Sequence, residues 1–376
     1  MMNHKSSAPD RIIPFHTSFT TGQELERLKA VFENTEFQGG YGMFTKKCES
    51  FLQSFTGSQR VLLTSSCTHA LEMCALLLDI HPSDEVIMPS FNFVSAANAF
   101  VLRGAVPVFV DIDSHTLNIT AENIEKAITN KTKAIVVMHY GGVSCDMRRI
   151  MDLADAHGLP VIEDAAHCID AYDQGKHLGS IGDLGTLSFH ATKNIHCGEG
   201  GALLVNNPKY LERAEFIRDK GTNRSQFNKK IVNKYTWVDI GSSYVMSEIT
   251  AAFLYEQLTH VHTVTQTRLQ IFGVYKNHLS DLLQTGDNRH NAHIAKLLHP
   301  KRDQIIAQLK KKNIESHFHY VPLHLSPMGK KFGRFSGSDR NTCMAGDQLF
   351  RLPIYPSLRH TPYIAEVVSE TLKKFN

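Results

Sequence analysis

The sequence predicts an α/β protein with a large, mixed, mostly parallel sheet domain and a smaller α/β C-terminal domain. Short apolar runs alternate with helical patterns from Val61 to Asp164, which favours a sheet covered on both faces. The chain has 376 residues and 42% hydrophobic content, enough for two lobes. We expect the large domain, with an N-terminal arm, at residues 1–255 and the small domain at 256–376.

The elements are expected in this order. An arm (1–21), a helix (23–32), a glycine loop (39–42) and a helix (44–55) come first. Strands at 61–63, 85–88, 106–110, 134–138 and 161–163 then alternate with helices at 70–78, 93–102, 121–128 and 147–157. Strands at 184–189 and 202–205 enclose a lysine and a glycine turn. Helices at 209–219 and 248–258 follow, and the latter continues through 272–282 after a bend. The small lobe holds a helix at 304–312, a strand at 317–320 and a helix at 364–374.

Composition excludes several classes of protein. Formal charge is only +3, from 40 basic and 37 acidic residues, which gives no case for a nucleic-acid groove. The seven cysteines are odd in number and show no CxxC spacing, as expected for a reduced, cytoplasmic protein. The N-terminus lacks the apolar core of a signal peptide, and no apolar run reaches the roughly 18 residues of a membrane helix.

Lys193 is the most unusual residue of the pattern. It lies between two apolar strands, just before the turn GEGG at 198–201. A lysine in a turn is usually a surface residue, and lysine is rarely buried unless it is paired or used chemically. A desolvated lysine next to a cationic group loses its proton more easily and attacks carbonyl groups.

Two further features gain meaning beside Lys193. The step Ser65–Thr68 joins a strand to a helix, whose N-terminus could bind phosphate, although an ordinary helix cap is the commoner role. Asp164 lies at the carboxyl end of a predicted strand, the place where ligands bind in parallel sheets. It could contact a ligand there, or it could cap the helix that follows. A phosphate cradle, a carboxylate and a lysine in this order match the needs of pyridoxal phosphate. Phe93, just after a strand, could stack on the cofactor ring.

The 21 histidines include a cluster in HFHYVPLH, with His317, His319 and His324. His317 and His319 alternate on a strand, as metal ligands could. No Cys, Asp or Glu is spaced to complete a tetrahedral site nearby, so we expect a structural or substrate-contacting role and no metal. The sequence also lacks a GxGxxG between a strand and a helix, so nicotinamide binding is a weak alternative.

The motifs SFHATKN, GEGG and VIEDAAH resemble the DegT/DnrJ/EryC1/StrS sugar-nucleotide aminotransferases, and the resemblance covers nearly the whole chain. KGTNRSQF, YTWVDIGSSYVM, HYVPLH and RLPIYPSL are most similar to members that make dTDP-4-amino-4,6-dideoxygalactose for enterobacterial common antigen. The resemblance implies a pyridoxal-phosphate-dependent transferase of fold type I, like aspartate aminotransferase. It also implies a homodimer whose active sites are shared between subunits.

The resemblance also implies roles for individual residues. Lys193 would bind the cofactor covalently and move the proton between cofactor and substrate carbons. Asp164 would hold the ring nitrogen, His167 would touch the ring or its hydroxyl, and Phe93 would stack on it. The phosphate would be bound by Cys67, Thr68 and Ser188. The substrate would contact Gly40, Phe44, His319, Tyr320 and His324.

The sequence departs from the family pattern at two places. The family takes one phosphate contact from the partner subunit, commonly the asparagine of GxNxR, whereas this chain has Ser243 and Val245 at those positions. We expect Ser243 to take that role. The segment between Leu282 and Ile305 is shorter than the family pattern. We therefore expect a small lobe with a missing or shortened strand, and with it either lower stability or altered substrate closure.

The implied reaction is a two-stage transamination. L-glutamate donates its amino group, and dTDP-4-dehydro-6-deoxy-glucose accepts it at the 4-keto carbon. A 3-aminotransferase, a gluco-configured 4-aminotransferase and a non-catalytic relative are alternatives. A related sugar dehydratase would carry histidine in place of Lys193.

Overall fold

The computed structural model describes residues 11–33, 39–279 and 290–375. Its largest sheet has the strand order β1-β9-β8-β5-β4-β2-β3-β12. Within it, β9 is antiparallel to both neighbours and every other neighbouring pair is parallel, which confirms the predicted mixed, mostly parallel sheet. The strands are β1 Arg60–Thr64, β2 Glu85–Pro89, β3 Val106–Val110, β4 Thr132–Met138, β5 Val161–Asp164, β8 Leu184–Ser188, β9 Gly201–Val205 and β12 Arg334–Ser336.

Helices cover both faces of this sheet. Successive strand residues point to opposite faces, so Leu62 packs with α3, whereas Leu63 packs with α2 and α9. Because both faces are buried, the strands are continuous apolar runs rather than alternating ones. One face carries α3 Cys67–Leu77, α4 Val94–Val101 and α7 Leu211–Arg218, and the other carries α2 Met43–Thr56, α5 Ala121–Glu125, α6 Met147–His157 and α9 Glu248–Leu258.

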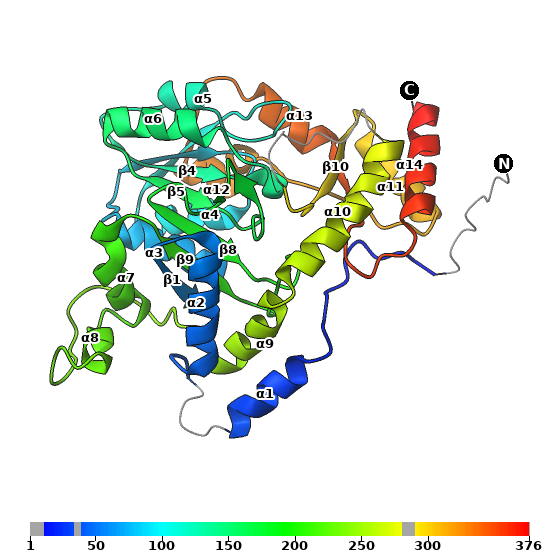
Figure 1. The fold of residues 1–376 in the computed structure, drawn as a ribbon. Helices are drawn as coiled ribbons and strands as arrows, with labels where there is room; N and C mark the ends of the chain where they lie inside the picture. Colours follow the sequence, from blue (N-terminus) through cyan, green and yellow to red (C-terminus); the bar gives the residue numbers. More distant parts are fainter. Residues whose placement is uncertain (1–10, 34–38, 280–289, 376) are drawn as a thin grey trace.

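The small lobe is built on a three-stranded antiparallel sheet in the order β10-β13-β11. Helix α10 runs from the large lobe towards this sheet, and α11 and α14 lie beside it (Figure 1). Strands β10 and β13 were not predicted from the sequence, and the expected strand at 317–320 is shorter. The bounds are β10 Ala295–Leu298, β11 His317–Phe318, β13 Leu349–Leu352, α10 Val261–His278, α11 Arg302–Lys311 and α14 Thr361–Phe375.

The chain passes from the large lobe to the small lobe through α9 and α10. The expected bent helix is two helices, because α9 ends at Leu258 and α10 begins at Val261. Val261 and Val264 pack in the large-lobe core, whereas Phe272 packs in the small-lobe core. Strand β12 comes from the C-terminal part but pairs with β3, so that part also completes the large sheet. Helices α12 Pro327–Phe332 and α13 Arg340–Gln348 flank β12.

The N-terminal arm contacts both lobes. Ile13 pairs with Ile314 of the small lobe, and its N–H donates to the carbonyl of Asn313 at 2.7 Å. Further along, α1 (Glu24–Glu33) lies against α9, where Arg27 forms an ion pair with Glu256 at 2.7 Å. The arm therefore crosses from one lobe to the other.

The segment expected to lack a strand forms one. Residues 280–289 lie outside the described residues, but Ala295–Leu298 forms β10, the full-length partner of β13. The small-lobe sheet is therefore built from this segment, contrary to the expectation of a missing strand. The remaining described elements are β6 Tyr172–Asp173, β7 Lys176–His177, α8 Arg224–Asn228 and the short 3-10 helices η1 Tyr140–Gly142, η2 Pro208–Tyr210 and η3 Leu323–Leu325. Among the described helices, none combines the length and the apolar character needed to cross a bilayer.

Candidate active site

A cavity of about 660 Å³ lies where the large lobe, the small lobe and the arm meet. The carboxyl ends of β4, β5 and β8 contribute Met138, Asp164 and Ser188 to its lining. This is the edge at which ligands bind in parallel sheets. The cavity volume lies in the range of cofactor and small-molecule sites.

The N-terminus of α3 forms one wall of the cavity. Ser66 caps the helix, since its hydroxyl accepts the N–H of His69 at 3.1 Å. Ser66 is thus the helix cap, and Ser66, Cys67 and Thr68 all line the cavity. The Thr68 hydroxyl is 2.8 Å from that of Ser95, which also lines the cavity. First-turn N–H groups and hydroxyls together suit an anionic group.

Gly201 lets β9 begin directly against this helix start. A Cβ atom at Gly201 would lie 2.3 Å from the Cys67 nitrogen, which no side chain could tolerate without a backbone shift. The glycine turn noted in the sequence is thus a packing requirement of the site.

Asp164 is buried at the end of β5, with 4% of its surface exposed. Its carboxylate accepts the N–H of Ala166 at 3.2 Å. Burial raises the pKa of Asp164, and the Ala166 N–H and the nearby charge of Lys193 only partly oppose this. A cationic ring nitrogen beside Asp164 would remove that cost.

Lys193 lines the same cavity from the loop between β8 and β9. Burial lowers the pKa of its ammonium, while the charges of Cys67 and Asp164 act in the opposite direction. Its backbone N–H donates to the carbonyl of His190 at 2.9 Å, which fixes the turn. A lysine with a lowered pKa supplies the neutral amine that attacks carbonyl groups.

Three histidine rings gather beside Lys193. The His167 ring lies 4.3 Å from that of His293 and 6.5 Å from that of His319, centroid to centroid. Burial lowers the pKa of all three, that of His319 to about 2, and the charge of Lys193 adds to the effect. These rings are therefore neutral at neutral pH and act as hydrogen-bonding groups. Gly141 donates its N–H to Nδ1 of His167 at 3.2 Å, which leaves the proton of the neutral ring on Nε2.

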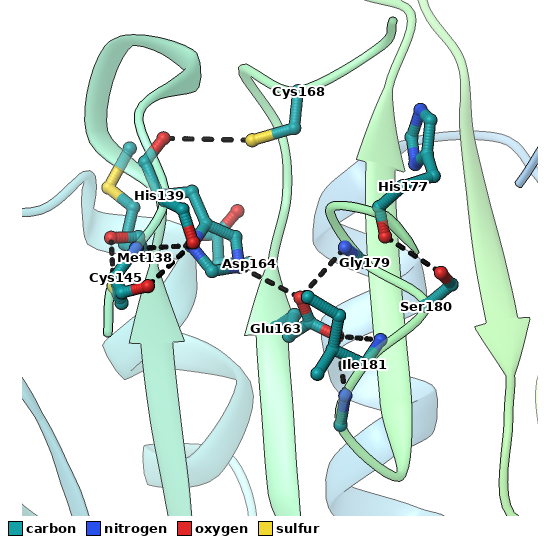
Figure 2. Close-up of polar contacts among 12 residues, drawn as sticks. Met138, His139, Cys145, Glu163, Asp164, Cys168, His177, Gly179, Ser180 and Ile181 are labelled. Atoms are coloured by element: carbon teal, nitrogen blue, oxygen red, sulfur yellow. Dashed lines mark hydrogen bonds and ion pairs between the residues drawn. The ribbon is translucent and has the colours of Figure 1, made fainter. Parts of the chain in front are cut away.

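A buried ion pair supports the strand that carries Asp164. Figure 2 shows Glu163, its neighbour in β5, bonded to His139 and to the turn near Gly179. The Glu163 carboxylate lies 2.8 Å from Nε2 of His139 and accepts N–H groups of Gly179 and Ile181 at 2.8 and 2.6 Å. Burial opposes charge on both groups. The neighbouring Cys145 and then Glu163 raise the pKa of His139, and the bond with His139 lowers the pKa of Glu163.

The sequence as a whole is similar to one known family of enzymes. The sequence profile of the DegT/DnrJ/EryC1/StrS aminotransferase family matches residues 20–371. The chain belongs to this family. It is 31% identical over 366 residues to the spore coat polysaccharide biosynthesis protein SpsC of Bacillus subtilis, covering 93% of this chain and 94% of that protein. It is 31% identical over 373 residues to GDP-perosamine synthase of Escherichia coli O157:H7, covering 96% and 98%.

The fold of the family is also found in solved structures. The aminotransferase TlmJ from Streptoalloteichus hindustanus superposes with a TM-score of 0.88 at 28% identity, covering 97% of this chain and all of that one. The chain is therefore a sugar aminotransferase with the α/β fold of pyridoxal-phosphate-dependent enzymes. Its family transaminates sugar nucleotides with this cofactor.

The described residues fit pyridoxal phosphate. The α3 N-terminus and Ser188 would hold the phosphate, and Asp164 would keep the proton on the ring nitrogen. Lys193 would hold the cofactor through Nζ and move protons. When bound, the cofactor carries the amino group and stabilises negative charge on the carbon that loses a proton. Phe93, at the start of α4 and 56% exposed, lines the cavity as a stacking residue would.

Most of the residues predicted from the sequence come together. Those that line the cavity are Cys67, Thr68, Phe93, Asp164, His167, Ser188, Lys193, His319 and Tyr320. The Tyr140 hydroxyl is 3.1 Å from Nδ1 of His319, and the Tyr320 ring stacks on that of His319 at 4.0 Å.

Three predicted substrate residues lie elsewhere in this chain. Phe44 is buried in the large-lobe core, where its backbone N–H donates to Glu248. Gly40 packs against Val245 and Met246. His324 contacts the Ser90 hydroxyl through Nδ1 at 2.7 Å, away from the cavity lining. None of the three lines the cavity of the described chain, and their role towards the substrate stays a prediction. Ser243 is exposed, and its role towards a partner subunit stays a prediction.

Several cavity residues were not predicted, and those that the small lobe, α10 and the arm contribute include Phe15, His16, Arg268, His293 and Arg351. They come from the arm, α10 and the small lobe, which the sequence pattern did not place beside the sheet. A signal existed for two of them. Arg351 begins the RLPIYPSL motif, and His293 ends the NAH stretch.

Proposed function

We propose that this aminotransferase moves the amino group of L-glutamate to C4 of dTDP-4-dehydro-6-deoxy-D-glucose. The products would be dTDP-4-amino-4,6-dideoxy-D-galactose and 2-oxoglutarate, for cell-surface polysaccharide synthesis. The sugar carbon gains two electrons, a hydrogen and the amino group, and the glutamate Cα loses them. The observation that carries the proposal is the meeting of Lys193, Asp164 and the α3 N-terminus in one cavity.

The sugar end of the cavity supports a carbohydrate substrate. His319 and Tyr320 present polar groups and stacked rings next to Lys193. A sugar needs both hydrogen-bonding partners and apolar faces, which such residues provide. The motif HYVPLH that contains them is among those most similar to galacto-configured 4-aminotransferases.

We also propose a homodimer with shared active sites. Large apolar side chains between 227 and 240 are exposed, including Trp237 at 80% and Ile231 at 66%. A group of this kind on one surface is typical of a protein–protein contact. Ser243 follows this stretch and is our candidate for a phosphate contact in the partner's site, and Gly40 and Phe44 lie near the same region. Seven unpaired cysteines fit our expectation of a cytoplasmic reaction.

Product analysis tests the sugar assignment. The holoenzyme is incubated with L-glutamate and dTDP-4-dehydro-6-deoxy-D-glucose, and the amino sugar is examined by NMR. We expect an amino group at C4 in the axial, galacto position. The Lys193→Ala protein serves as the inactive control.

Each alternative has its own signature in the same experiment. An equatorial C4 amine identifies a gluco-configured enzyme, and an amine at C3 from the 3-keto isomer identifies a 3-aminotransferase. A GDP-linked keto sugar, used in parallel, tests the nucleotide. Preferential turnover of the GDP-linked sugar would contradict the dTDP assignment.

A further inference from the structure

Two arginines line the cavity without a carboxylate partner. Arg268 comes from α10 and Arg351 from β13. Among the described residues, no Asp or Glu forms an ion pair with either guanidinium group. Arg268 donates to the carbonyls of Ala292 and His293, at 3.1 and 2.8 Å. Arg351 makes one such bond, to Phe318 at 3.2 Å, and its Nε has no acceptor in the described chain.

Two guanidinium groups without a carboxylate partner lower the stability of the protein when no ligand is bound. Buried charges are normally paired, and an uncompensated one reduces stability. Arg218, by contrast, is buried with the carboxylate of Glu49 as its partner. Burial lowers the pKa of Arg351 and lowers that of Arg268 to about 9. Both guanidinium groups therefore gain from a bound anion.

We propose that Arg351 and Arg268 form a subsite for a dicarboxylate, namely the amino donor and its 2-oxo product. A guanidinium group can bind a carboxylate through two parallel hydrogen bonds, and the two groups match in number the two carboxylates of a five-carbon donor. Arg268 would use its terminal Nη atoms, because its Nε already donates to the Ala292 carbonyl. The proposal rests on the function proposed above, because it names how the donor of that reaction is recognised.

The surroundings of Arg351 hold it in place for this role. Its guanidinium lies 4.6 Å from the Phe15 ring centroid, and the Phe15 N–H donates to Glu315 at 2.9 Å. The arm therefore supports the guanidinium without neutralising it. His16, the next arm residue, also lines the cavity, and its Nε2–H donates to the Ala191 carbonyl at 2.9 Å.

The diphosphate of a nucleotide is the competing anion. A donor amine must reach Lys193, and both arginines line the same cavity as Lys193. The two guanidinium groups also equal in number the two carboxylates of a dicarboxylate. Measuring the affinity of the enzyme for a dicarboxylate and for a nucleotide diphosphate therefore distinguishes the two possible ligands of the arginines.

The test measures binding to the holoenzyme by calorimetry with glutarate, butyrate and dTDP. Glutarate carries both carboxylates but no amino group, so it cannot react. We expect glutarate to bind the unaltered enzyme more tightly than butyrate. Arg351→Gln and Arg268→Gln should each weaken glutarate about 10- to 100-fold, the range of a lost hydrogen bond between charged groups, and leave dTDP affinity unchanged.

Two further variants make the result decisive. Arg103→Gln is the matched control, since the Arg103 Nε also lacks an acceptor but the residue does not line the cavity. Arg351→Lys keeps the charge without the paired donors, so it should bind glutarate with intermediate affinity. It also replaces Arg351→Gln if circular dichroism shows that variant unfolded.

Glutarate affinity equal to that of the Arg103→Gln control in both cavity variants would overturn the proposal. Loss of dTDP affinity with unchanged glutarate affinity would assign the arginines to the nucleotide and also overturn it. If the variants lose glutarate affinity but the enzyme makes no 4-amino sugar, the carboxylate subsite stands and the sugar assignment fails.

Discussion

At the scale of the residue, the buried carboxyl of Asp164 lowers the stability of the cofactor-free protein while serving its expected role towards the cofactor. Its carboxyl binds a proton more tightly when buried in the folded chain than in the unfolded chain, because burial raises its pKa. As pH rises through that raised pKa, the folded state must hold an unfavourable buried charge. At neutral pH Asp164 therefore reduces the stability of the cofactor-free protein.

We predict opposite effects of Asp164→Asn on stability and activity. The melting temperature of the cofactor-free protein should rise or stay equal at pH 7 to 8, because the buried charge is gone. Transamination should fall by about 100-fold or more, since the ring nitrogen loses the acid that keeps it protonated. Calorimetry and a coupled 2-oxoglutarate assay measure the two quantities.

Asp152→Asn is the control, because Asp152 is exposed on α6. It should change neither quantity. A fall in melting temperature with Asp164→Asn, at unchanged activity, would show that the carboxylate is structural.

At the scale of the element, the end of β5 is held by Glu163. Its carboxylate joins His139 of the β4–η1 connection to the turn after β7, as Figure 2 shows. Both side chains of the pair have 0% exposure. Replacing one partner leaves the other charge buried and unpaired.

Glu163→Gln should lower the free energy of unfolding by about 3–5 kcal/mol, the usual cost of breaking a buried ion pair. Urea denaturation of the large lobe measures it. The exposed pair Glu122–Arg149, at 2.5 Å, supplies the control, and Glu122→Gln should cost at most about 1 kcal/mol. Equal losses in both variants would refute the role assigned to Glu163.

The contact between β9 and α3 gives a second prediction for an element. Gly201→Ala places a methyl group 2.3 Å from the Cys67 nitrogen, so the helix start must move. We expect a loss of about 1–3 kcal/mol, as for overpacked cores, together with weaker binding of pyridoxal phosphate. Fluorescence titration of the cofactor measures that affinity.

Gly273→Ala in α10 is the matched control, because a Cβ there meets nothing within 4 Å. It should raise stability by up to about 1 kcal/mol through helix propensity. Unchanged cofactor affinity in Gly201→Ala would show that Gly201 does not contribute to the proposed phosphate site at the start of α3.

At the scale of the whole molecule, local sequence patterns predicted most of the large sheet and the outer helices of the small lobe, but not strands β10, β12 and β13. Runs such as Val106–Val110 are buried on both faces and bounded by turns, so they are visible in the sequence. Strands β10 and β13 have four residues each, too short for a clear period. Strand β12 has three, and only its pairing with β3, more than 200 residues earlier, makes it a strand.

The residues of the candidate site likewise fall into a group that the sequence predicts and a group that it does not. Lys193, Asp164 and the α3 start follow strands of the predicted sheet, so their meeting follows from the topology. Arg268, Arg351 and Phe15 reach the cavity only through packing of the lobes and the arm, which periodicity does not encode. The burial of Phe44 in the large-lobe core was not predicted, because a glycine loop does not determine which face of the following helix is buried.

The most direct test of the account follows the amino group into the enzyme. L-glutamate is added to purified holoenzyme without sugar, while the absorbance of the cofactor and the release of 2-oxoglutarate are recorded. We predict a shift of the absorption band with 2-oxoglutarate equimolar to the enzyme, and neither change in Lys193→Ala. Release of 2-oxoglutarate by Lys193→Ala at the unaltered rate, or an unaltered enzyme that shows no shift, would contradict the central role of Lys193.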